Sequence, residues 1–343
     1  MSDVQRLAVR RFRGGPGRAV VALLLAFVVL ATACAPAESP EGHFRLVLVG
    51  SFGSSVDNPG SGPGQLWHPI GLGVQSDGSI AVAEEANWRV QLFTPLGRPA
   101  GFVGGRQGGA DTVPGLFREL AHLAIAPNGT TFICDRGDGR IQAFRDGKFM
   151  AWWRQTRPIG IAVNPSGTGL YTTDEDNYVR NYDLHGTLLR SWGGFGTDRG
   201  MFRGASAVAV GPHGDVFVAD TDNNRVQRFT HDGAFVLEWG ASPPAYAAGA
   251  DIGALDQPTA IAVDRDNIVY VGERGNHRIQ VFSVDGDVLG LWSAIEVVAA
   301  PTWSPRGMAV TSGRMLYVCD YNGNRVYELA RIHHSARGAL VWP

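Results

Sequence analysis

ASAVAVGPHGDVFVADTDNNRVQRF, residues 205–229, contains the pattern that decides the fold. A run of alternating small and aliphatic residues leads through a glycine turn to a second apolar segment, which ends at Asp220. A polar turn then leads to a third alternating segment, which begins at Arg225. A period of two is typical of strands, and glycine, asparagine and aspartate favour the tight turns between them. The stretch therefore predicts three consecutive antiparallel strands.

The same pattern occurs six times along the chain. Successive copies of the first run are separated by 51, 38, 47, 53 and 47 residues, and the runs begin at Gly71, His122, Gly160, Ala207, Ala260 and Gly307. A fourth apolar strand follows each of the first five copies, as in TLLRSW and AFVLEW. Four antiparallel strands in a unit of this size make one blade of a propeller, and six blades lie within the usual range. The sequence predicts an all-β, six-bladed β-propeller over residues 44–343, with four antiparallel strands per blade.

Two further features fit this architecture. The small residues of each first strand are expected where inner strands crowd their neighbours near the axis, with the alternating aliphatic residues pointing into the core between blades. Two segments could supply the outer strand of the sixth blade, FRLVLV at 44–49 and ALVW at 339–342. We favour the N-terminal segment, because the FG that follows it matches the strand exit in SWGGFG.

Residues 1–33 resemble a targeting segment. A basic head precedes an apolar run of 15 residues, 19–33, which is short for a membrane-spanning helix but suits a signal peptide. The small residues before Cys34 resemble a bacterial lipobox, in which that cysteine is lipidated after cleavage. An uncleaved membrane anchor and an ordinary signal peptide cut near Ala33 remain open. All three interpretations predict export, with general secretion favoured over the twin-arginine route.

The predicted domains are therefore a lipoprotein-type signal peptide (1–33), a short tether (34–43) and the propeller. Removing five arginines and one aspartate with the signal peptide leaves 25 basic against 31 acidic residues, a formal net charge of −6. This balance argues against nucleic acid as a partner. We expect a monomeric cell-envelope lipoprotein, anchored by lipid at the outer face of a bacterial membrane or in the periplasm.

Several copies closely resemble the NHL repeat. The resemblance rests on PIGIAVNPSGTGLYTTD (158–174), on residues 205–229, on PTAIAVDRDNIVYVGERGNHRIQVF (258–282) and on the lead-in GQLWHP (64–69). Proline, turn glycine, acid, asparagine, arginine and aromatic recur in a fixed order from about residue 44 to 332. This resemblance implies a β-propeller fold, and together with the targeting segment it suggests an exported bacterial lipoprotein of that family.

An acid ends the second strand of every copy, at Glu84, Asp135, Asp174, Asp220, Glu273 and Asp320. A feature present in every blade is expected to be architectural, with the acid capping its turn and pairing with an arginine five residues later. Those arginines are Arg89, Arg140, Arg225, Arg278 and Arg325. In the third copy Tyr178 takes the arginine position, so Asp174 is expected to lack a partner.

Cys134 and Cys319 directly precede two of these acids, in the second and sixth copies. Because the first blade lies between them, their separation should exceed the roughly 7 Å between α-carbons that a disulfide permits. We expect buried free thiols.

An enzyme with this repeat, peptidyl-hydroxyglycine amidating lyase, resembles the chain in architecture, and that family places zinc-binding histidines after the blade proline. The matching positions hold no histidine: Ile70, Ala121, Ile159, Ser206, Thr259 and Arg306. His68 and His122 with Glu119 could supply ligands, but a zinc site needs three such ligands and an open position. DTDNN and DEDN resemble parts of a calcium loop without its downstream glutamate. We therefore predict no cofactor, with zinc or calcium as the alternative.

Function should lie in residues that differ between blades, since loops on a rigid scaffold commonly carry it. The candidates flank the inner strands: Trp67, His68, Glu119, His122, Arg157 and Arg306. They predict a binding protein that recognises an extracytoplasmic protein, peptide or glycan through the propeller face. The alternative is a metal-dependent lyase or hydrolase with its site in the axial channel. RNA binding, known for eukaryotic NHL propellers, conflicts with export and negative charge.

Overall fold

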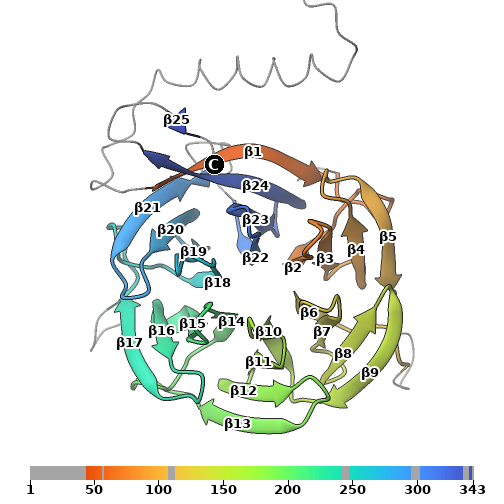
Figure 1. Ribbon diagram of the computed structural model, residues 1–343, viewed down its shortest axis with the longest axis horizontal. Helices are drawn as coiled ribbons and strands as arrows, with labels where there is room; N and C mark the ends of the chain where they lie inside the picture. Colours follow the sequence, from red (N-terminus) through yellow and green to blue (C-terminus); the bar gives the residue numbers. More distant parts are fainter. Residues whose placement is uncertain are drawn as a thin grey trace, which may run out of the picture. The chain divides into compact units, whose positions relative to one another are not determined.

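The computed structural model describes residues 44–55, 58–106, 113–241, 247–294, 302–334 and 340–341. Residues 42–343 form one compact unit, in which six antiparallel sheets surround a central axis (Figure 1). The predicted six-bladed propeller is confirmed. The predicted signal peptide, Cys34 and the tether lie outside the described residues. Within the described ranges, no helix is long and apolar enough to cross a membrane.

The strands follow one another outward from the axis in each blade. Blade 1 contains β2 (Pro69–Val74), β3 (Ile80–Glu84), β4 (Arg89–Phe93) and β5 (Pro99–Gly104). Blade 2 contains β6 (Leu120–Ile125), β7 (Thr131–Asp135), β8 (Arg140–Arg145) and β9 (Lys148–Arg154). Blade 3 contains β10 (Pro158–Val163), β11 (Gly169–Asp174), β12 (Tyr178–Asp183) and β13 (Leu188–Gly193).

The second half of the ring repeats this order. Blade 4 contains β14 (Ala205–Val210), β15 (Val216–Asp220), the short 3-10 helix η2 (Thr221–Asn223), β16 (Arg225–Phe229) and β17 (Phe235–Gly240). Blade 5 contains β18 (Pro258–Val263), β19 (Val269–Glu273), β20 (Arg278–Phe282) and β21 (Val288–Ser293). Blade 6 contains β22 (Pro305–Val310), β23 (Met315–Asp320), β24 (Arg325–His334), β1 (Phe44–Gly53) and β25 (Leu340–Val341).

The ring is closed by its N-terminal strand. β1 pairs antiparallel with β24 from Phe44 opposite His333 to Gly53 opposite Arg325, so the predicted N-terminal closure is confirmed. The C-terminal candidate also pairs with β24, but only as β25 at its far end, beyond the last residue that pairs with β23.

A buried arginine reinforces this closure. Arg331 of β24 pairs with Asp264 at 2.7 Å and with Asp266, both in the β18–β19 turn, and its guanidinium lies 4.9 Å from the ring centroid of Phe44. Blade 5, blade 6 and the N-terminal strand therefore meet at one side chain.

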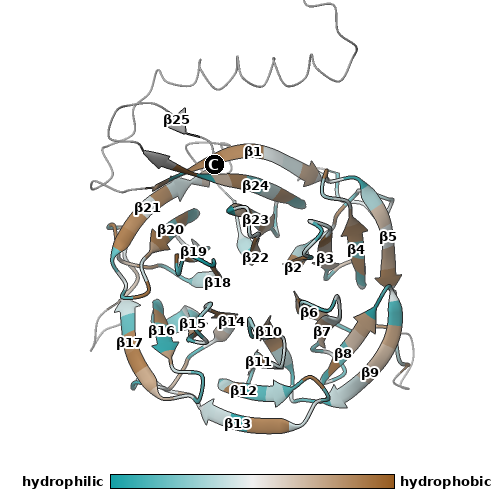
Figure 2. Ribbon diagram, in the orientation of Figure 1, coloured by the Kyte–Doolittle hydropathy of each residue, from teal (hydrophilic) through white to brown (hydrophobic). Residues whose placement is uncertain are grey.

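Hydrophobic packing between blades forms the core. Apolar and polar residues are interspersed along middle strands such as β4, β8 and β20, and Figure 2 shows brown, apolar segments around the whole ring. The apolar side chains belong to separate clusters between neighbouring blades. The inner strands approach very closely: a Cβ on Gly307 would lie 2.9 Å from the Cα of Gly71. The predicted reason for small residues on these strands is therefore correct.

Four of the five predicted acid–arginine pairs form, at 2.6–2.8 Å and with buried carboxylates: Glu84–Arg89, Asp135–Arg140, Asp220–Arg225 and Glu273–Arg278. The arginine also donates to carbonyls of the loop that precedes the blade, as Arg225 does to Asp198 and Met201 at 3.0 and 2.9 Å. A glutamine two residues further along donates to the same acid in each of these blades. Each cluster therefore holds the loop that leads into its inner strand.

The other two blades correct the prediction. Asp174 does not lack a partner, because Arg180 donates to it at 2.7 Å from the position that glutamine takes elsewhere. In blade 6, Arg325 donates instead to the carbonyl of Ser54 at 3.1 Å, while Asp320 accepts from the backbone N–H of Ser304 at 3.0 Å. Arg325 therefore binds the residue that follows β1 instead of pairing with Asp320 as predicted.

Cys134 and Cys319 are buried free cysteines, as predicted. Their thiols contact the neighbouring inner strands, at the carbonyls of Gly160 and Gly71 respectively. Burial raises the pKa of both thiols, which keeps them protonated and unreactive.

Candidate binding face at the mouth of the axial channel

Every inner strand begins with a bulge. The register against the second strand of the blade shifts directly after its first residue in all six blades. A bulge leaves residues unpaired and redirects their side chains, and bulges are common beside functional sites. In β6 the shift spans Ala121 and His122, and in β22 it spans Arg306 and Gly307. The two polar side chains His122 and Arg306 therefore occupy bulged positions.

Two loop positions in each blade lie beside these bulges. The residue after the blade acid donates its backbone N–H to the carbonyl of the residue before the inner strand, as Arg136 does to Glu119 at 2.8 Å and Tyr321 to Ser304 at 2.9 Å. Together the two positions form what we call the entry face: His68, Glu119, Arg157, Gly204, Gln257 and Ser304 before the strands, and Glu85, Arg136, Glu175, Thr221, Arg274 and Tyr321 after the acids.

Arg136 is the centre of a charge network on this face. It pairs with Glu119 and lies 3.6 Å from Glu85 and 3.8 Å from Glu175. Arg157 pairs with Glu175, with one contact at 2.8 Å, and lies 4.0 Å from Glu119. Three carboxylates and two guanidinium groups from blades 1, 2 and 3 are thus joined, and the side chains of Arg157, Glu175 and Glu119 are 50, 35 and 33% exposed.

An aromatic group continues the network into blade 6. The Tyr321 hydroxyl donates to Glu85 at 2.5 Å, and the His68 ring stacks on the tyrosine with centroids 4.3 Å apart. Burial and the charge of Glu85 raise the pKa of Tyr321, so it stays a donor at neutral pH. The guanidinium of Arg306 lies 5.4 Å from the centroid of the same ring.

Arg306 and Arg274 differ from Arg136 and Arg157, because no ion pair joins either of them to a carboxylate of the described residues. The Nε of Arg306 is buried without a hydrogen-bond partner, as is that of Arg136. Burial and the neighbouring positive charge of Arg274 lower the pKa of Arg306. Arg274 itself donates its Nε to the side-chain oxygen of Gln257 at 3.0 Å. The blade 5 and 6 side of the face is therefore positive, opposite the acidic side chains of blades 1 to 3.

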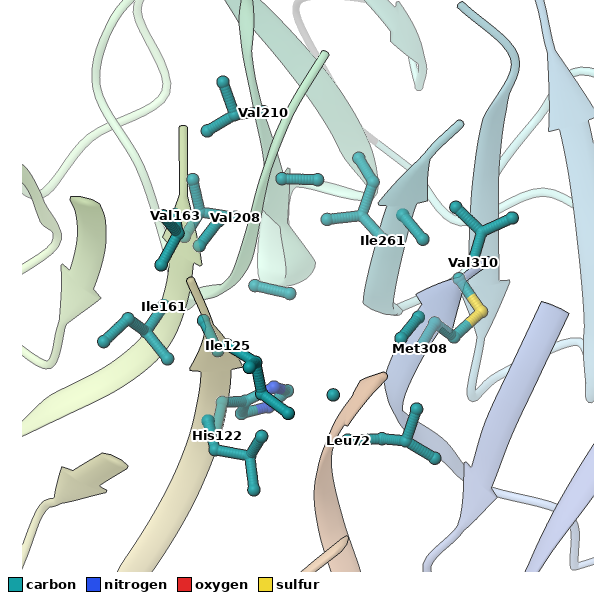
Figure 3. Close-up of a pocket in the computed structure, with 18 of the residues that line it drawn as sticks. Leu72, His122, Ile125, Ile161, Val163, Val208, Val210, Ile261, Met308 and Val310 are labelled. Atoms are coloured by element: carbon teal, nitrogen blue, oxygen red, sulfur yellow. The ribbon is translucent and has the colours of Figure 1, made fainter. Parts of the chain in front are cut away.

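The axial channel opens at this face. A cavity of about 200 Å³ is lined by aliphatic side chains of all six inner strands together with His122 and Arg306. Figure 3 shows Leu72, Ile161, Val208 and Met308 around the axis, with the His122 ring among them. Burial, Arg306 and Arg136 lower the pKa of His122 to about 4, so its imidazole is neutral at pH 7.

A model of the NHL repeat matches residues 202–229 and 255–282, which lie in blades 4 and 5. The chain is a six-bladed β-propeller that contains NHL repeats. It is 28% identical to human NHL repeat-containing protein 3 over 233 residues, which cover 59% of this chain and 62% of that protein. It is 30% identical to protein brain tumor of Drosophila melanogaster over 155 residues, covering 42% of this chain and 14% of that protein. The chain thus spans less than two thirds of these relatives.

Solved structures share the fold of this NHL-repeat propeller at low sequence identity. A streptogramin B lyase aligns with a TM-score of 0.56 and 16% identity, covering 87% of this chain and 86% of that one. Kuenenia stuttgartiensis hydrazine synthase aligns with a TM-score of 0.52 and 13% identity, covering 79% and 96%. At this identity the likeness concerns the fold alone.

The propeller brings five of the six predicted binding residues to the entry face or the channel mouth: His68, Glu119, His122, Arg157 and Arg306. Trp67 lies beside them, 41% exposed, with its ring centroid 6.3 Å from that of His68. Five further residues of the entry face were not predicted from the sequence: Glu85, Arg136, Glu175, Arg274 and Tyr321. They could have been found by their variation between blades, because the residue after the acid differs from blade to blade as much as the residue before the inner strand does.

The donors considered for zinc are otherwise engaged in the NHL-repeat propeller. Glu119 is paired with Arg136, and the ring of His68 is stacked on Tyr321. Across the described ranges, no three His, Cys, Asp or Glu side chains gather as a metal site requires. These residues do not fit a zinc centre as they are arranged.

Proposed function

We propose that the NHL-repeat propeller is an exported binding protein whose entry face recognises an extracytoplasmic protein, peptide or glycan. The observation that supports this most is the separation of charges into two sets. The repeated acids are buried and hold loops, whereas the charged residues of the entry face differ between blades and are partly exposed. The basic and apolar segment before Cys34 supports export and lipid anchoring.

The exposed network is better suited to recognition than to stability. Ion pairs at this exposure contribute about 0–1 kcal/mol to folding. A partner that covers the face would exclude water and strengthen the same interactions. The arrangement favours a ligand with a positive group toward Glu119 and Glu175 and a negative group toward Arg306.

Quantitative capture with matched variants tests this function. The full chain in lipid nanodiscs would be incubated with cell-envelope extracts and with a glycan array, and the ligands that it captures would be quantified. The double variant Arg157→Gln, Glu175→Gln would be measured in parallel. Asp285→Asn, an exposed acid in the β20–β21 turn, is the control because it removes charge away from the entry face. We expect a defined set of ligands that the control retains and the double variant loses. Ligands that bind both variants equally would exclude the entry face as the binding surface.

A further inference from the structure

A side chain at one repeated position joins most blades to the next blade of the ring. This residue directly precedes the arginine position, and its side chain hydrogen-bonds to the backbone of the loop that leads into the next inner strand. We call this contact the junction brace. It occurs at 2.6–2.9 Å at four junctions: Asn324 with His68 (blades 6 and 1), Asn177 with Gly204 (3 and 4), Asn224 with Gln257 (4 and 5) and His277 with Trp303 (5 and 6).

The two junctions of blade 2 hold other residues at this position. Trp88 of blade 1 has an indole that cannot accept a hydrogen bond, and its ring instead lies 4.7 Å from the guanidinium of Arg106. Gly139 of blade 2 has no side chain. Neither residue can therefore accept from a backbone N–H of the next blade as the asparagines do.

The charge network of the entry face crosses these same two junctions. Arg136 of blade 2 lies 3.6 Å from Glu85 of blade 1 and 3.8 Å from Glu175 of blade 3. Arg157 of blade 3 lies 4.0 Å from Glu119 of blade 2. These ionic contacts are longer than the braces, and their side chains are 24–50% exposed. Salt screens ion pairs of this kind, whereas a hydrogen bond between an uncharged amide and a backbone N–H has no net charge to screen.

We propose that the charge network holds blade 2 between its neighbours in place of the brace, and that the entry ends of these two junctions open when its contacts are screened or displaced. Blade 2 is then the movable blade of the ring. A charged ligand that pairs with Glu119 or Arg157 would act on the same contacts and would thereby change the position of this blade. The inference goes beyond the proposed binding function and does not depend on it.

Two buried thiols provide a matched pair of probes. Cys134 lies between blades 2 and 3, with its sulfur 4.0 Å from the carbonyl oxygen of Gly160. Cys319 lies between blades 6 and 1, with its sulfur 3.8 Å from the carbonyl oxygen of Gly71. Both cysteines directly precede the blade acid and are fully buried. The first thiol therefore reports on a junction without the brace, and the second on a junction with it.

Labelling of the full chain in nanodiscs with N-ethylmaleimide, measured for each peptide by mass spectrometry, compares the two thiols and separates them from Cys34. Between about 20 mM and about 500 mM NaCl, the labelling rate of Cys134 should rise at least about threefold, because the ionic contacts are screened. Cys319 should keep its rate. Since global unfolding exposes both thiols, Cys319 is the internal control. Rates that do not depend on salt, or that rise together, would overturn the proposal.

Reciprocal exchange of the brace tests its part directly. Gly139 has a φ of 61°, close to the 52° of Asn224, and an added Cβ would first meet the carbonyl oxygen of Gln155 at 3.3 Å. Gly139→Asn should therefore supply a brace, slow the labelling of Cys134 and lessen its response to salt. Asn324→Gly removes a brace and should accelerate the labelling of Cys319. The opposite changes would contradict the assigned role of the brace.

Removal of the central arginine tests the network. Arg136→Gln should raise the low-salt labelling rate of Cys134 to the level that the unchanged chain reaches at high salt. Arg118→Gln is the matched control, because Arg118 pairs with Asp138 of the same blade at 2.7 Å. Equal rates in these two variants would show that the network does not hold the junctions. If a variant does not fold, the salt comparison on the unchanged chain still decides. Ligand capture is not measured here, so this inference and the proposed function can each fail alone.

Discussion

Replacing Asp220 by asparagine should destabilise the propeller more than the same change at Asp320. Asp220 accepts from Arg225 at 2.7 Å, from Asn223 at 2.9 Å, from Gln227 at 3.1 Å and from the backbone N–H of Arg203 at 2.7 Å. The Arg225 side chain is fully buried, and Asp220→Asn removes one of its carboxylate partners while Glu238 stays paired with it at 2.6 Å. Breaking a buried ion pair on one side costs about 3–5 kcal/mol, and the remaining Glu238 contact places the expected cost toward the lower end, at about 3–4 kcal/mol.

Asp320 provides the matched comparison within the same chain. It is equally buried, but the arginine at the corresponding position donates to Ser54 instead. Asp320→Asn removes hydrogen bonds to backbone donors without removing the carboxylate partner of a buried arginine, which costs about 1–3 kcal/mol.

Thermal unfolding of the full chain, followed by circular dichroism, measures the difference. At about 2 °C per kcal/mol for a chain of this size, Asp220→Asn should lower the melting temperature by about 6–8 °C and Asp320→Asn by about 2–6 °C. Equal decreases, or a larger decrease for Asp320→Asn, would refute the conclusion that the arginine pair determines the cost.

Three further predictions concern the channel, the metal hypothesis and the anchor. The pKa of His122 is about 4 in the folded chain and about 6.5 in the unfolded chain, so the unfolded chain binds this proton first as the pH falls. The folded chain should therefore lose stability between about pH 6.5 and pH 4, and His122→Gln should lessen the fall in melting temperature over that range. Parallel curves of melting temperature against pH for the two proteins would contradict this. Elemental analysis of the purified full chain should find no stoichiometric zinc or calcium, whereas metal that is lost in the double variant His68→Ala, His122→Ala would favour the lyase or hydrolase hypothesis. Cys34→Ser should abolish labelling by palmitate and move the chain from the membrane to the soluble fraction, while membrane association that persists without lipid would favour an uncleaved anchor.

The fold could be predicted from the sequence because its determinants repeat. Small residues on the inner strands and the acid recur in all six copies, and the turn glycine recurs in five, so a weak signal at one position is reinforced by the others. Closure by the N-terminal strand was predictable for a different reason, since the FG that follows residues 44–49 matches the strand exit in SWGGFG. Structure and sequence therefore agree wherever one blade resembles the next.

The two wrong predictions concern the acid partners in blades 3 and 6, where the arginine makes a different contact from its equivalents in the other blades. Arg180 lies two residues after Tyr178, and because side chains two apart on a strand point to the same side, it reaches the acid from the glutamine position. Ser54, which takes Arg325, belongs to a segment 271 residues away in sequence, and no local pattern indicates such a contact. The first error could have been avoided from strand periodicity alone, whereas the second required the closed ring.

The candidate site was only half predictable for a related reason. The residues before the inner strands could be selected because they differ between blades, whereas the equally variable residues after the acids were not selected. The backbone bond between Arg136 and Glu119, and its equivalents in the other blades, place the two columns side by side. Each blade of this propeller therefore has two adjacent entry-face positions whose residues differ between blades. They lie beside a buried cluster whose residues largely recur. In four of the six blades an acid, an arginine and a glutamine beneath these positions hold the loop. We therefore expect the entry-face residues to tolerate changes of charge without loss of the fold, and we propose that they set ligand specificity.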